Sequence, residues 1–164
     1  MMARLTLTIA GIAVLSACAG ERSSPTESVG PAMGTDSAVY HARLDERTIR
    51  VTIGFRYTNR TDGPVYVGRC RFDHPPSLQK LVEGAWVTAY SPVVLMCWEP
   101  PTVIARGATY DGVLHVVMGR AGTNIHPKVE VPPLAGTYRL FWYISGQDPL
   151  PERERTSTPF EIRE

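Results

Sequence analysis

The stretch RTIRVTIGFRYTN, residues 47–59, alternates apolar and polar side chains along most of its length. One face would carry the apolar set, which consists of Ile49, Val51, Ile53, Phe55 and Tyr57. Successive side chains of a β-strand point to opposite faces, so this period of two predicts a strand with one buried face. The NRTDGP segment that follows contains Asp-Gly, a pair typical of tight turns, and we expect the chain to reverse there.

Outward from this strand, other apolar or alternating segments lie between turn residues, at 64–72, 77–90, 92–98, 102–119, 135–145 and 156–164. None shows a convincing helical period, and the 14 Gly and 14 Pro residues suit many short strands joined by turns. Trp142 alternates with Leu140 and Ile144, which predicts a core position. The pattern as a whole predicts an all-β fold, an antiparallel β-sandwich over residues 38–164.

The N-terminus has the features of an export signal. Arg4 precedes an apolar run from Leu5 to Leu15, which is too short to span a bilayer but fits the core of a signal peptide. The tetrapeptide LSAC, residues 15–18, resembles the lipobox of bacterial lipoproteins. That resemblance implies a signal peptide at 1–17, cleavage before Cys18, and acylation of the Cys18 thiol. An ordinary secretory peptide and an uncleaved anchor remain alternatives.

The lipoprotein resemblance also implies a place for the protein. It would be exported and held by membrane lipid at the cell envelope through its acylated Cys18. Lipoproteins retained at the inner membrane often have Asp after the Cys, and Ala19 at this position favours the outer membrane. Residues 18–37 are rich in Ser, Gly, Pro, Thr and Glu and lack a hydrophobic period, which predicts a flexible tether between the anchor and the domain.

Two cysteines remain if Cys18 is acylated. In an exported protein Cys70 and Cys97 most simply form a disulfide, and the closed loop of about 27 residues would contribute roughly 3.5 kcal/mol in the chain-entropy treatment. A metal site is the rival interpretation, but the sequence contains neither CxxC nor HxxxH spacing. We therefore expect no metal and no cofactor.

The domain also resembles the immunoglobulin-like domains of bacterial lipoproteins. The shared pieces are YTN at 57–59, Cys70, GAW at 84–86, Cys97, IARG at 104–107 and GTYR at 136–139. The resemblance implies an immunoglobulin-like sandwich and carries no activity with it. In such folds a tyrosine early in a late strand often turns its hydroxyl back to a preceding loop, and Tyr138 is the candidate for this tyrosine corner. An ordinary strand tyrosine is the alternative.

Catalytic signatures are weak. The sequence has no GxSxG, HExxH or P-loop motif, and His41, His74, His115 and His126 are scattered along it. The segment PLPERERT, residues 149–156, is expected to be a solvated charged loop. We therefore predict no catalytic residue and no enzymatic activity.

Recognition would then fall to loops on the sandwich. Asp73, His74, Trp98 and Glu99 are the candidates, because loop aromatics on a rigid scaffold are frequent binding residues. Packing of Trp98 over the disulfide is the alternative. The net charge of +1 argues against nucleic acid as a partner and leaves another envelope protein. The function predicted is a non-catalytic binding module; the alternatives are a protease-inhibitor-like sandwich, an accessory domain of an envelope enzyme, and a structural role.

Overall fold

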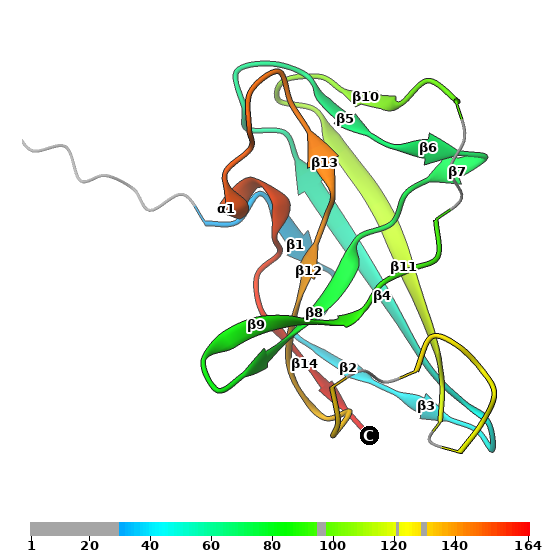
Figure 1. Ribbon diagram of the computed structural model, residues 1–164. Coiled ribbons are helices and arrows are strands. Elements are labelled where there is room, and N and C mark those ends of the chain that lie inside the picture. The colour runs from blue at the N-terminus through cyan, green and yellow to red at the C-terminus, as the bar shows by residue number, and fades with distance from the viewer. Residues whose placement is uncertain (1–29, 95–97, 121, 129–130) are drawn as a thin grey trace, which may run out of the picture.

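The protein is described by a computed structural model that places residues 30–94, 98–120, 122–128 and 131–164 (Figure 1). These residues form mainly antiparallel β-sheets with one short helix, which confirms the prediction of a β-rich domain. The predicted signal peptide, Cys18 and Cys97 lie outside the described residues. Within the described ranges, no helix has the length and apolar character needed to cross a membrane.

The first sheet is built on β4 (Thr48–Thr58). This strand pairs antiparallel with β11 (Thr109–Gly119) over the full length of both. The opposite edge of β4 holds two short strands, β1 (Met33–Thr35) and β3 (Arg43–Leu44). The strand predicted for 47–59 is confirmed, and every member of its apolar set is buried.

The other strands form a five-stranded sheet, a three-stranded sheet and a hairpin. The second sheet has the order β2–β14–β12–β8–β9, with bounds Val39–His41, Phe160–Arg163, Gly136–Phe141, Ser77–Val82 and Ala85–Tyr90. The third has the order β10–β5–β13, with bounds Thr102–Ile104, Val65–Val67 and Ile144–Ser145. Strand β13 continues the line of β12 (Figure 1). The remaining elements are β6 (Arg69–Cys70), β7 (Phe72–Asp73) and helix α1 (Glu152–Arg155).

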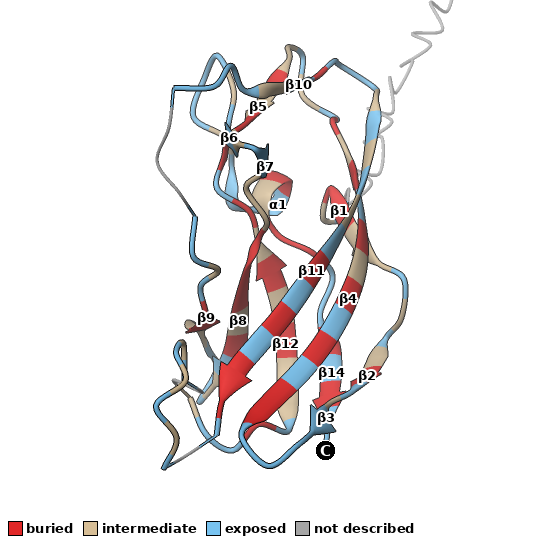
Figure 2. Cartoon of the chain, turned by 90° about the vertical axis from the view of Figure 1, so that its right-hand side faces the viewer, coloured by how far each residue is buried: buried red, intermediate tan, exposed pale blue. Residues whose placement is uncertain are grey.

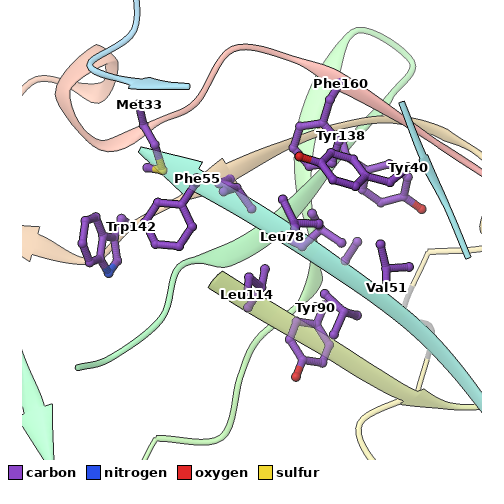
Figure 3. Close-up of a cluster of buried hydrophobic side chains, with 14 of the residues drawn as sticks. Met33, Tyr40, Val51, Phe55, Leu78, Tyr90, Leu114, Tyr138, Trp142 and Phe160 are labelled. Atoms are coloured by element: carbon purple, nitrogen blue, oxygen red, sulfur yellow. The ribbon is translucent and has the colours of Figure 1, made fainter. Parts of the chain in front are cut away.

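One apolar core lies between the β4–β11 sheet and the strands β8, β12 and β14 (Figures 2 and 3). Several of its aromatic pairs meet edge to face, as aromatic quadrupoles prefer. The Trp142 ring lies 5.3 Å from Phe55 and 5.6 Å from Tyr57, centroid to centroid. Trp142 is only 1% exposed, which confirms its predicted core position.

The domain begins earlier than predicted. Ala32 and Met33 are 4% and 0% exposed, and β1 is part of the first sheet, so the boundary at residue 38 is wrong. The amide of Thr58 donates to the carbonyl of Ala32, and the amide of Thr158 donates to that of Met33. A single buried methionine among Gly, Ala and Pro shows no period, because the partners that bury it come from distant strands.

Three further predictions need correction. Strands β2 and β14 pair in parallel, Val39 opposite Glu161, because they come from opposite ends of the chain and no hairpin sets their direction. The described part of the run at 92–98 contains no strand. The charged segment at 149–156 includes α1, in which Glu154 is 7% exposed and so is buried rather than solvated.

Candidate functional site

The hairpin β6–β7 projects beside the third sheet at one end of the domain (Figure 1). Cys70 pairs with Phe72, and Arg71 between them adopts a φ of 64°, a left-handed conformation that reverses the chain in a single residue. The Phe72 side chain points outward and is 72% exposed. The Arg71 guanidinium lies 5.7 Å from the centre of the Phe72 ring, within reach of a cation–π contact.

Glu99 joins the segment after Cys97 to this hairpin. Its Oε1 accepts a hydrogen bond of 3.0 Å from the amide of Arg71, and its Oε2 lies 3.8 Å from Nε of Arg69. Trp98, one residue earlier, is fully exposed. The alternative, in which Trp98 packs over a disulfide, is therefore not what the described residues show. Phe72, Trp98 and Glu99, with the two arginines, form a surface that we call the aromatic tip.

Asp73 holds the hairpin to the third sheet. Its Oδ1 accepts a 2.5 Å hydrogen bond from the Thr102 hydroxyl, and its Oδ2 accepts a 2.9 Å bond from the Tyr110 hydroxyl. Burial, and then this hydrogen bond to Asp73, raise the pKa of Tyr110 to about 12. Both carboxylate oxygens are thus used within the fold, and Asp73 positions the tip rather than facing a partner.

His74 is likewise part of the support. Its amide donates to the carbonyl of Gly68, and its own carbonyl accepts a 2.6 Å bond from Nε1 of the buried Trp142. A Cβ at Gly68 would lie 2.7 Å from Nδ1 of His74, so the backbone approaches the ring closely. Of the four predicted recognition residues, Trp98 and Glu99 lie at the surface of the aromatic tip. Asp73 and His74 instead hold the hairpin to the rest of the fold.

Ser77 and Lys80 have the S-x-x-K spacing of serine–lysine nucleophile pairs. They lie on strand β8, where side chains three positions apart point to opposite faces. Lys80 is 5% exposed, and its Nζ donates to the carbonyls of Val131 and Pro133. This arrangement gives the lysine a structural partner and does not bring it to Ser77.

A second surface lies on the outer face of the first sheet. A groove of about 710 Å³ is lined by His41, Arg43, Arg50, Thr52, His115 and Val117, among others. Sequence reasoning treated the histidines as scattered and missed this cluster. Only the pairing of β11 with β4 places His115 opposite Thr52, and no local motif encodes that register.

Among the described residues, no group of three His, Cys, Asp or Glu side chains is placed to hold a metal ion. Comparison with known proteins finds no relative: no protein-family profile, no curated protein and no solved structure matches the chain. The site must therefore be interpreted from its own chemistry. Cys70 lies in β6 at the base of the tip, while its predicted partner Cys97 is outside the described residues.

Proposed function

We propose that this chain is an exported lipoprotein whose domain, an immunoglobulin-like sandwich, acts as a non-catalytic binding module through its aromatic tip. The observation that carries the proposal is the exposure of Phe72 and Trp98 on a loop pair that Glu99 and Asp73 hold in place. Large aromatic side chains and arginines contribute most of the free energy in protein interfaces. A rigid support lowers the entropy lost when such side chains bind.

The partner that fits the tip is another envelope protein. Two aromatic rings would enter an apolar depression on it, and the guanidinium of Arg71 beside them would meet a carboxylate at its rim. Glu99 lies beside Arg69 and Arg71 and offsets part of their charge, so apolar burial rather than electrostatic attraction would supply most of the affinity.

The lipoprotein part of the proposal rests on residues 1–18. The apolar signal core ends at Leu15, the lipobox ends at Cys18, and the first buried residue of the described chain is Ala32. Fully extended, the chain between Cys18 and Ala32 would reach at most about 50 Å, at 3.3–3.6 Å per residue. A partner in the same membrane, or one lying close to it, is within that reach.

The immunoglobulin-like part is supported by two sheets packed over one core and by the hydrogen bond from the Tyr138 hydroxyl to the carbonyl of Leu134. This is the backward contact expected of a tyrosine corner. In the second sheet, β2 comes first along the chain and β14 comes last, and the two pair directly in parallel without a hairpin between them.

Site-specific photocrosslinking in the native host tests the proposal. A photoreactive amino acid at position 98 should capture one or a few envelope proteins reproducibly, and Phe72→Ala should reduce the yield several-fold. The matched control is the same probe at Leu81, an exposed leucine of β8 near the turn to β9, which should capture none of them. Equal capture from positions 98 and 81, or none from 98, would reject the aromatic tip as the binding surface.

A further inference from the structure

The groove on the first sheet is lined by basic side chains from β3, β4 and β11, which belong to that sheet, and from β2, which belongs to the second sheet. Along β4, Arg50 and Thr52 occupy successive exposed positions. Figure 2 shows exposed and buried bands alternating along this strand. The pairing register places Arg43 of β3 opposite Arg50, and His115 of β11 opposite Thr52. The Thr52 hydroxyl lies 3.5 Å from Nδ1 of His115.

The charges in the groove are of one sign. None of its lining residues is acidic. The side chain of Arg43 forms no hydrogen bond or ion pair with any residue in the described part of the chain. Arg50 has a partial partner at the rim, since its Nε lies 3.2 Å from the Thr48 hydroxyl and 3.6 Å from Oδ2 of Asp45.

The two arginines Arg43 and Arg50 destabilise the fold when no ligand is bound. Arg43 and Arg50 are direct cross-strand partners, and like charges in directly opposite positions of an antiparallel pair repel each other. An anion between the two guanidinium groups would convert that repulsion into two attractions. The Arg–Arg pair and the lack of a carboxylate in the groove are independent observations, and both point to a negatively charged ligand.

We propose that this groove binds a phosphate group carried on a small organic body. Guanidinium groups offer paired N–H donors that match the oxygens of a phosphate. Two arginines, the Thr52 hydroxyl and the imidazole of His115 present more donors than the two oxygens of a carboxylate can accept, whereas a tetrahedral phosphate presents at least three. The volume of about 710 Å³ exceeds the need of a bare ion and leaves space for a sugar or glycerol unit over Val117, which is 40% exposed.

Such a phosphate could belong to a soluble sugar phosphate or to the headgroup of an anionic phospholipid. Titration calorimetry of the mature chain in neutral detergent micelles distinguishes these two sources. One arm adds glycerol 3-phosphate; the other adds phosphatidylglycerol to the micelles. Binding in the first arm identifies a soluble phosphate compound, and binding in the second arm alone identifies a headgroup. Either result supports the groove as the phosphate site if Arg43→Gln weakens binding about ten-fold or more, as the loss of a charge-assisted hydrogen bond implies.

Arg56→Gln is the matched control. Arg56 lies on the same outward face of β4, outside the groove, and its Nε is 2.7 Å from Oδ1 of Asp111. Its loss removes the same charge from the sheet and should change the affinity less than two-fold. Because the Arg43 side chain makes no hydrogen bond or ion pair with the described residues, Arg43→Gln should leave the thermal midpoint unchanged or raise it. No binding in either arm, or equal weakening by both variants, would overturn the proposal.

Discussion

The hydroxyl of Tyr138 in β12 donates a hydrogen bond of 2.5 Å to the main-chain carbonyl of Leu134, four residues earlier. Both residues are buried, and the ring of Tyr138 stacks on that of Phe160 at 6.5 Å. The bond fixes the loop before β12 against the core. Lys80 reinforces the same loop from β8, since its Nζ lies 5.6 Å from the centre of the Tyr138 ring and donates to Pro133.

Tyr57 provides a matched comparison with Tyr138. Burial raises the pKa of both phenols to about 12, so both carry a proton at neutral pH, but the hydroxyl of Tyr57 finds no hydrogen-bond partner among the described residues. Tyr138→Phe should lower the free energy of unfolding by about 1–3 kcal/mol, because it leaves a buried carbonyl without its donor. Tyr57→Phe should be neutral or stabilise by up to about 1 kcal/mol. Urea denaturation of the two variants checks this, and equal losses would contradict the assignment.

Gly112 of β11 lies opposite Phe55 of β4, and the phenyl ring covers it. A Cβ at Gly112 would lie 2.4 Å from Cζ of Phe55, a buried ring that also packs edge to face against Trp142. Gly112→Ala should therefore destabilise the fold by about 1–3 kcal/mol through overpacking. Gly34→Ala is the control, because nothing lies within 4 Å of its Cβ position, and it should change stability by less than about 0.5 kcal/mol. The midpoint of thermal unfolding, monitored by circular dichroism, checks both variants. An unchanged midpoint for Gly112→Ala would contradict the prediction.

Asp45 should titrate at an unusually low pH. Hydrogen bonds from the Thr48 hydroxyl, and then from the amides of Arg47 and Thr48, lower the pKa of its carboxyl to about 2, from an ordinary value of 3.8. A depressed pKa stabilises the fold above pH 4, and that contribution is lost as the pH falls through about 2. Carboxyl carbon shifts in an NMR titration should show this midpoint, and Thr48→Val should move it upward. A midpoint near 4 in the unsubstituted protein would show that these bonds do not persist in solution.

The state of the cysteines can be read from intact mass. Protein from native membranes should have the mass of residues 18–164 plus acyl chains, and alkylation should label no thiol before reduction and two after it, Cys70 and Cys97. Reduction should lower the free energy of unfolding by roughly 3.5 kcal/mol. A full-length, unacylated chain with three reactive thiols would contradict both the anchor and the disulfide.

Local patterns of the sequence determined much of the scaffold. The period of two in 47–59 specified which face of β4 is buried, and the alternation around Trp142 placed that ring in the core. Both results follow from one strand alone, because the direction of each side chain is set by its position along the pleat. The exposure of Trp98 was also within reach, since a loop aromatic beside Glu-Pro-Pro has no strand neighbours to cover it.

The pairing of distant strands decided the rest. Met33 lies between β4, where it pairs with Tyr57, and the segment at Ser157 near the C-terminus. Asp73 turns inward because its carboxylate accepts hydrogen bonds from Thr102 and Tyr110. The groove exists only because β3, β4 and β11 adopt one particular register, which sets Arg43 against Arg50 and His115 against Thr52. A shift of one residue would reverse every side chain, and this choice depends on the packing of the whole core rather than on any local segment.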